Sequence, residues 1–312
     1  MDTNTYIKYS VNRHLNTKKH LKVNPKQVTN LKKELMESIE YLSAVQDQKG
    51  DFRSTDDLLG KVIGGYKKKE VTLIAGLPKS GRTVLLINCL KQHNTNLFPS
   101  IFFSTRLSNR ELGIMFLCSE FKLDLGKLLS RKLSKTDFDI FDADKIKYLS
   151  KYDNVYINDT VPLSMTYIKK QLKHLKSAGF IDLMIIDDIG LTCFNETNFL
   201  NNRTRFKKII KSLSILAKKE DIHLILNMRL ENRLIEINNE PDLNNDEFEK
   251  VRLIEKFVNN IVIVNRGKKS IYDKSKTGGG EFIELIPYKT SLEKKVIKRY
   301  QYISKFGLIV DK

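Results

Sequence analysis

Short runs that are mostly apolar, separated by longer amphipathic segments, recur along this chain and restrict its possible folds. The runs lie at 71–75, 100–104, 154–159, 182–187, 223–228 and 260–264. Strands without a polar face are typical of parallel sheets covered by helices on both sides. The spacing between them predicts helices over 83–92, 109–121, 164–178 and 202–220, and closing antiparallel strands at 282–287 and 296–302. With 312 residues, the chain is long enough for one large α/β domain or two small ones.

The N-terminal segment differs from this alternating pattern. Residues 1–24 are polar and basic and predict a flexible arm. Residues 25–48 predict an amphipathic helix that begins at Pro25, and Gly50 ends it. Two roles are open for its apolar stripe, which can pack on the chain's own core or dock on a neighbouring subunit. The stripe consists of Val28, Leu31, Leu35, Ile39 and Leu42.

The composition excludes several classes of protein. Lys and Arg number 55 against 37 Asp and Glu, giving a formal charge of +18. This excess favours a polyanionic partner such as nucleic acid, or else reflects lysines on solvated faces. Cys89, Cys118 and Cys193 are widely spaced, which argues against a disulfide framework or zinc site. No apolar run reaches the ~18 residues of a membrane span, and the N-terminus has no signal peptide. We therefore expect a cytoplasmic protein without membrane contacts.

A glycine-rich segment follows the first apolar run and opens the next predicted helix. Residues 76–83 read GLPKSGRT, which fits the phosphate-loop pattern except that Arg82 replaces its lysine. Backbone N–H groups of such a loop cradle phosphates, and Thr83 would hold Mg²⁺ through its hydroxyl. The sequence thus predicts ATP and Mg²⁺ as ligands, although a relic loop that binds nothing is the alternative. The expected nucleotide-binding residues are Gly76, Lys79, Ser80, Gly81, Arg82 and Thr83.

Two carboxylates end the apolar run at 182–187. Asp187 would lie beside the phosphate loop, where open α/β sheets bind their ligands, and would join Thr83 around Mg²⁺. Asp188 is a candidate base for an attacking water, or simply the solvated end of a strand. Together with the loop about a hundred residues upstream, the pair indicates a P-loop ATPase core.

Further motifs follow one another along the chain: FSTRL at 103–107, YIND at 156–159, IIDDIGL at 185–191, LNMRLENR at 226–233 and IVIVNR at 261–266. In this order they resemble the C-terminal domain of DnaB-type replicative helicases, from about residue 51 to residue 312. Residues 25–50 resemble the family's linker helix, which implies that their apolar stripe packs on a neighbouring subunit. The resemblance implies a RecA-like P-loop fold with a mostly parallel sheet flanked by helices. It also implies a role in DNA replication, single-stranded DNA as a ligand, and either self-association into a ring or binding to a helicase or primase.

The departures from the family pattern fall on residues that carry the chemistry. Arg82 replaces the loop lysine, Arg106 stands at the catalytic glutamate, Gly190 at the nucleotide-sensing glutamine, and 288–290 at the segment that reaches the neighbour's phosphate. These changes predict a pseudo-helicase with weak or lost hydrolysis. The alternative is an active ring-forming helicase with a rebuilt site, in which Asp188 or Glu111 serves as base and Lys289 as clamp.

The candidate DNA contacts are also basic. The stretch that would grip DNA in the family, 230–250, carries many acidic residues, which opposes a phosphate track. The basic loop that begins at Arg266 is a better candidate, because it contains glycine and little acid. The expected DNA-binding residues are Arg229, Arg233, Arg266, Lys268 and Lys269.

Overall fold

The structure is a computed structural model of the chain. It describes residues 29–45, 58–95, 99–130, 132, 134, 143–179, 181–190, 202–230, 236–237, 240–241, 247–268, 281–290, 292 and 295–311. The arm expected at 1–24 lies outside these residues and stays a prediction, as does the division of the chain at residues 24 and 50.

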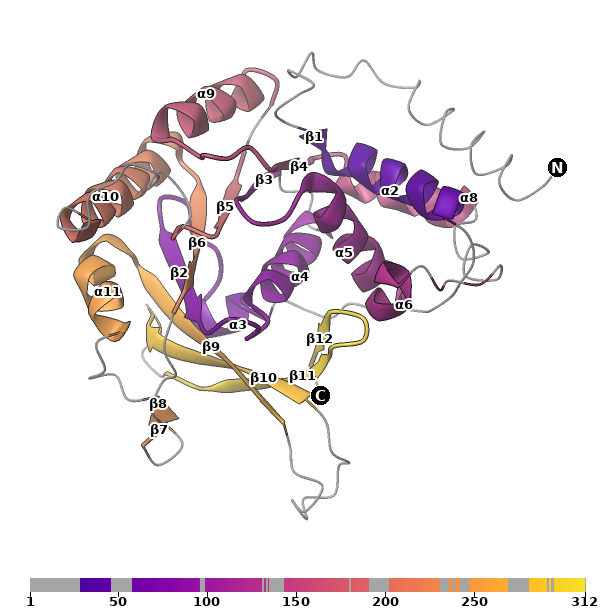
Figure 1. Ribbon diagram of the computed structural model, residues 1–312. Coiled ribbons are helices and arrows are strands. Elements are labelled where there is room, and N and C mark those ends of the chain that lie inside the picture. The colour runs from indigo at the N-terminus through magenta and orange to yellow at the C-terminus, as the bar shows by residue number, and fades with distance from the viewer. Residues whose placement is uncertain are drawn as a thin grey trace.

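One large sheet forms the centre of the molecule (Figure 1). Its ten strands lie in the order β1-β4-β3-β5-β6-β2-β9-β10-β11-β12, and β7 pairs with β8 in a separate hairpin. The strand bounds are β1 Thr29–Asn30, β2 Val71–Gly76, β3 Ser100–Ser104, β4 Val155–Asn158, β5 Leu183–Asp187, β6 His223–Arg229, β7 Glu236–Ile237, β8 Glu240–Pro241, β9 Asn260–Lys268, β10 Glu281–Lys289, β11 Lys298–Ile303 and β12 Leu308–Val310.

The apolar runs form the parallel part of the sheet, as the sequence predicts. Strands β4, β3, β5, β6, β2 and β9 pair in parallel along this order. Strands β9 to β12 continue the sheet by antiparallel pairing, which confirms the two predicted closing strands. Since β2, β3 and β5 are buried at every residue, both faces of the sheet need a cover.

Helices provide this cover on both faces (Figure 1). The strands alternate between two buried clusters, since Phe102 joins one while Ile101 and Phe103 join the other. The first cluster lies under α2 Leu31–Val45, α3 Gly60–Ile63, α4 Arg82–Thr95, α5 Asn109–Phe121, α6 Leu125–Leu129, α8 Ala143–Tyr148 and the 3₁₀ turn η1 Leu149–Tyr152. The second lies under α9 Met165–Lys176, α10 Asn202–Glu220, α11 Glu247–Ile254 and the turn η3 Glu255–Phe257. In the described ranges no helix has the length and apolar character needed to cross a bilayer.

The N-terminal helix packs on its own domain. Helix α2 begins at Leu31, six residues later than predicted, because Thr29 and Asn30 pair with β4. Its Leu31, Leu35 and Ile39 are buried in the same cluster as α4 and α5. The expectation that this stripe docks on a neighbouring subunit is therefore wrong for these residues, since the chain's own core covers them.

A glycine allows α2 to approach α5 closely. A Cβ added at Gly113 of α5 would lie 2.7 Å from the Ser38 Oγ and 3.3 Å from the Glu34 carbonyl oxygen, both on α2. Any larger side chain at this position would push the helices apart. The close contact explains why α2 shares the core of the domain instead of standing apart from it.

A buried ionic cluster fixes α4 against α5 behind the phosphate loop. The Lys91 ammonium lies 3.0 Å from a Glu120 carboxylate oxygen and donates to the Ser119 carbonyl. Lys151 also pairs with Glu120, and the Tyr152 hydroxyl donates to it at 2.8 Å. Burial lowers the pKa of Lys91 to about 8, against the attraction of Glu120. Because removing one member would leave a buried charge unpaired, the cluster locks the relative position of the two helices.

We expect Leu35→Ala to lower the free energy of unfolding by about 2–5 kcal/mol, because it leaves a cavity in a shared core. Urea unfolding followed by circular dichroism measures this. Lys33→Ala is the matched control on α2, since its ion pair with Glu37 is exposed and should contribute less than about 1 kcal/mol. Equal, small effects of both changes would show that α2 is not part of the folded core.

Candidate functional site

The candidate site lies at the C-terminal ends of the parallel strands. Their register places Gly76 of β2 beside Arg229 of β6, and Asp187 of β5 beside Asn227 of β6 and Ser104 of β3. The phosphate loop and the acidic strand end therefore meet at one edge of the sheet. This edge is where open α/β sheets bind ligands.

The loop between β2 and α4 requires both of its glycines. Gly81 has a φ of +90°, and a Cβ there would lie 2.4 Å from the Ile283 Cδ1. A Cβ at Gly76 would lie 2.5 Å from the Val264 carbonyl oxygen. Lys79 also adopts a positive φ, of 63°. The loop thus turns tightly into the N-terminus of α4, as the phosphate-loop pattern predicts.

A cavity of about 330 Å³ opens beside this loop. Its walls come from the loop and α4, from the end of β3, and from strands β9 and β11. The lining residues are Lys79, Ser80, Gly81, Arg82, Thr83, Val84, Arg106, Leu107, Arg266 and Tyr302. Cations from three separate elements surround it, which suits a ligand with several negative charges.

Thr83 and Asp187 lie together, as expected for a pair of Mg²⁺ ligands. The Thr83 hydroxyl donates to the Asp187 Oδ2 at 2.8 Å. Burial raises the pKa of Asp187, while its hydrogen bonds from Thr83 and Asn227 oppose that rise. A hydroxyl and a carboxylate fit Mg²⁺, which usually takes one or two protein oxygens and completes its shell with water and phosphate. The donor set is therefore suitable for the metal that a phosphate loop uses.

Arg82 is buried below the loop, with 5% of its surface exposed. One guanidinium nitrogen, Nη1, donates to the Asn227 Oδ1 at 2.7 Å and lies 3.9 Å from an Asp188 oxygen. Burial lowers the pKa of Arg82, and Asp188 and Asp187 oppose that shift. The charge of Arg82 is thus used within the protein, although part of the side chain lines the cavity.

Asn227 is the site residue that the sequence analysis missed. It donates to Asp187 through its amide nitrogen and accepts from Arg82 through its oxygen, so it joins the two. Its exposed fraction is only 1%. The available signal was a polar amide inside an otherwise apolar strand, which requires buried hydrogen-bond partners.

Neither candidate base belongs to the residues that line the cavity. Asp188 is 2% exposed, and its Oδ1 accepts from the Gly190 N–H at 2.8 Å. Glu111 caps helix α5, where its Oε2 accepts from both the N–H and the hydroxyl of Ser108. Both carboxylates are thus held by local backbone structure.

Two cations of the cavity have no neutralising partner in the part of the chain that the structure describes. Among the described residues, the side chains of Lys79 and Arg106 have no hydrogen bond or ion pair with one another or with any other group. Arg106 follows β3 directly, at the position where the resemblance calls for a catalytic glutamate. Its charge is close enough to Arg82 to oppose the protonated form of that residue.

The expected DNA contacts are not all brought together. Arg266 lies at the nucleotide cavity: it stacks on Tyr302 at 4.5 Å, donates to the Lys79 carbonyl at 3.1 Å and pairs with Glu281 at 2.7 Å. Arg229 is exposed at the end of β6, beside Gly76. Lys268 is the last residue of β9, while Arg233 and Lys269 lie outside the described residues.

Comparisons with known proteins agree with this geometry. The model of the DnaB-like helicase C terminal domain matches residues 52–295. Replicative DNA helicase DnaB of Synechocystis sp. is 28% identical over 167 residues, which is 52% of this chain and 18% of the relative. Replicative DNA helicase DnaB of Buchnera aphidicola is 24% identical over 228 residues, 71% of this chain and 49% of the relative. The chain thus spans less than half of either relative.

Solved structures are similar to this chain in fold. One solved ATPase domain aligns with a TM-score of 0.68 and 16% identity, over 89% of this chain and 98% of that domain. A DnaB-like replicative helicase, solved in a study of its interactions with primase, aligns with the same TM-score and 17% identity, over 86% of this chain and 63% of that one. At these identities the alignments show the fold, which is RecA-like. The match to the family model, which covers most of the chain, shows that this protein belongs to the DnaB-like helicase C-terminal domain family.

Proposed function

We propose that this chain binds ATP with Mg²⁺ and acts in DNA replication, while hydrolysing the nucleotide weakly or not at all. The observation that carries the proposal is the position of two arginines at the phosphate loop. Arg82 is committed to Asn227 and Asp188 below the loop, and Arg106 lines the cavity where the resemblance implies a base.

The argument against fast hydrolysis rests on proton transfer. Attack of water on a phosphoryl group needs a residue that orients the water and accepts its proton. The Arg106 side chain has only hydrogen-bond donors, so it cannot take up the proton of an attacking water. Asp188 accepts from Gly190 and lies 3.9 Å from Arg82, so its oxygens are engaged within the protein. These contacts disfavour the alternative in which Asp188 replaces the base.

The argument for binding rests on the remaining donors. The turn from the loop into α4 offers backbone N–H groups, and Lys79 and Arg106 offer cations without a described partner. Arg106 thus supplies charge to a bound polyphosphate in place of the buried Arg82. Thr83 and Asp187 would hold Mg²⁺, which would neutralise phosphate charge when bound. Strong binding with little catalysis follows from a site that holds the ground state but lacks a base.

The far wall of the cavity suits a nucleobase. Arg266 is stacked on the ring of Tyr302, and its guanidinium is anchored by Glu281 and by the Lys79 carbonyl. A planar base can stack on such an aromatic and guanidinium surface. The stacking wall and the phosphate loop line the same cavity. The cavity can therefore contact a base and phosphates together, which favours a nucleotide over a bare polyphosphate.

The partners follow from the family and the charge. Single-stranded DNA is the proposed polyanion, with Arg229 as an exposed cation beside the loop. We propose that the chain either self-associates into a ring or binds a helicase or primase. A structure of similar fold comes from a study of a DnaB-like replicative helicase and its interactions with primase. The alternative of an active ring helicase needs Lys289 as a clamp for a neighbour's phosphate. In the structure Lys289 donates to the Glu255 and Val258 carbonyls of its own chain at 2.8 and 2.7 Å.

We expect steady-state ATPase rates of the wild type, with and without single-stranded DNA, to lie well below the ~1–100 per second usual for phosphoryl-transfer enzymes. Arg106→Glu combined with Arg82→Lys should raise turnover by more than the product of the two single effects, because base and clamp act as a unit. Arg106→Gln is the matched control, since it removes the charge without supplying a base. Brisk wild-type turnover, abolished by Asp188→Ala, would contradict the proposal.

The affinity for Mg²⁺-ATP should fall at acidic pH by a larger factor than the affinity for ATP measured in EDTA, which removes the metal. The raised pKa of Asp187 means that protons compete with the metal at higher pH than they would at an ordinary aspartate. Protonation removes the negative charge that attracts Mg²⁺, so affinity is lost as pH falls through this pKa. Isothermal titration from pH 8 down to pH 5 checks the trend. Asp187→Asn, an uncharged near-isostere, should abolish the Mg²⁺-dependent part of the affinity. Identical pH profiles for the wild type and this variant would contradict the assignment.

Tyr302→Ala should weaken ATP binding by roughly 5- to 150-fold, the equivalent of ~1–3 kcal/mol for one stacked base. Binding of inorganic tripolyphosphate should be nearly unchanged, because it has no base to stack. Tyr302→Phe keeps the ring and should bind ATP like the wild type. If both ligands lose affinity equally in the alanine variant, the wall does not recognise a base.

A further inference from the structure

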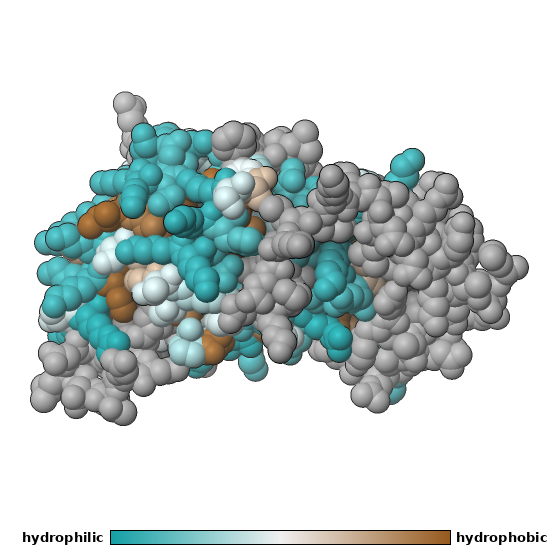
Figure 2. All heavy atoms as spheres, turned by 90° about the horizontal axis from the view of Figure 1, so that it is seen from above, coloured by the Kyte–Doolittle hydropathy of each residue, from teal (hydrophilic) through white to brown (hydrophobic). Residues whose placement is uncertain are grey.

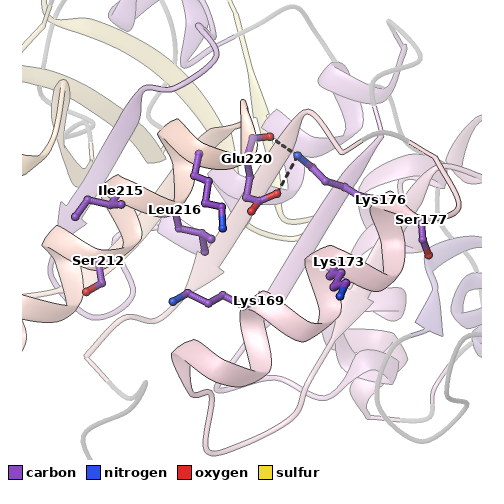
Figure 3. A pocket seen from close by; sticks show the side chains of 9 residues that line it. Lys169, Lys173, Lys176, Ser177, Ser212, Ile215, Leu216 and Glu220 are labelled. Carbon is purple, nitrogen blue, oxygen red and sulfur yellow. Dashed lines mark hydrogen bonds and ion pairs between the residues drawn. The ribbon is translucent and has the colours of Figure 1, made fainter.

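A groove lies between α9 and α10, on the face of the sheet opposite α4. Its volume is about 550 Å³. Figure 3 shows side chains from both helices converging on it. The lining residues are Lys169, Lys173, Lys176, Ser177, Ser212, Ile215, Leu216, Lys219 and Glu220. None of these lines the nucleotide cavity, so the groove is a separate surface.

The α10 side of the groove is apolar. Ile215 is 56% exposed, the highest value among the exposed large hydrophobic residues of the described chain. Its neighbour Leu216 is 3% exposed and joins the core below. Seen from above, the side of the molecule with α9 and α10 carries hydrophobic patches between hydrophilic side chains (Figure 2). Ile215 therefore offers an apolar contact inside a hollow that is rimmed by polar side chains.

The rim of the groove is basic and largely unneutralised. Lys176 donates to the Glu220 carbonyl and lies 3.3 Å from its carboxylate, so the one acidic lining residue is already paired (Figure 3). Lys169, Lys173 and Lys219 have no hydrogen bond or ion pair within the described residues. Lys169 and Lys173 are spaced i, i+4 on α9, where like charges repel each other. Within the described residues, these three ammonium groups therefore lack a negatively charged partner.

We propose that this groove docks an acidic amphipathic helix of a partner protein. The apolar stripe of such a helix would cover Ile215, and its Asp and Glu side chains would meet Lys169, Lys173 and Lys219. Charge complementarity selects the acidic partner, and the apolar wall selects a protein, since phosphates gain nothing from an isoleucine.

The test measures fluorescence anisotropy of a labelled synthetic helix binding to the full chain at low salt. The probe is an 18-residue peptide with Leu at i, i+3, i+4 and i+7 and with Glu on the flanking positions. A second peptide has Lys in place of every Glu. We expect the acidic peptide to bind and the basic one not to bind. The double variant Lys169→Glu with Lys173→Glu should weaken binding roughly tenfold or more, and Ile215→Ser should weaken it several-fold.

The matched control is Lys208→Glu with Lys211→Glu. Both residues are exposed on α10, neither lines the groove, and the double reversal makes the same change in net charge. Thermal unfolding by circular dichroism verifies that each variant is folded. Equal loss of binding in the groove and control variants would reduce the interaction to net charge and overturn the proposal.

Three further outcomes would also overturn it. If single-stranded DNA binding falls in the groove variant but not in the control, the occupant is nucleic acid. If sedimentation shows that the groove variant alone loses self-association, the occupant is a second copy of this chain. Unchanged peptide affinity in both groove variants would mean that the peptide binds elsewhere.

Discussion

A buried chain of polar contacts below the phosphate loop holds the functional edge of this protein together. It runs from the Thr83 hydroxyl to Asp187, then through Asn227 to the guanidinium of Arg82, which faces Asp188. Each group would be costly to bury alone, and each contacts the next, although the Nε of Arg82 has no hydrogen-bond partner among the described residues. Because the members come from α4, β5 and β6, these contacts also fix the position of the loop against the two central strands.

This chain of contacts separates two tasks that a P-loop enzyme usually combines. The conformation of the loop and the Thr83–Asp187 pair are retained, and these are the parts that hold phosphate and metal. The cation of the loop, Arg82, is instead buried against Asn227 and Asp188. A second cation, Arg106, lines the cavity. The resulting site is rich in charge that stabilises a bound polyphosphate and poor in groups that can accept a proton. Such a set of residues can keep the P-loop fold without supporting hydrolysis, as the proposed function requires.

Much of the fold could be predicted from the sequence, because short, mostly apolar runs without a polar face have few alternatives to a covered parallel sheet. Gly76, Gly81, Thr83 and Asp187 were also predictable, since the loop motif and the acidic strand end each carry a local signal. The position of Arg82 was not, because whether a long side chain points into a cavity or into the core depends on Asn227, which lies 145 residues away. The seat of α2 was missed for a similar reason, as an apolar stripe does not specify whether the same chain or another one covers it.

The burial of Arg82 also limits which substitutions this position tolerates. A lysine here keeps a cation but lacks the guanidinium that donates to Asn227 and faces Asp188. Removing one partner of a buried ion pair typically costs ~3–5 kcal/mol, a large share of the ~5–15 kcal/mol by which domains are stable. An uncharged residue at position 82 would carry that cost in full, whereas a lysine would avoid it only if its ammonium reached the same two side chains. Positions 82, 188 and 227 are therefore coupled, and the effect of changing one depends on the residues at the other two.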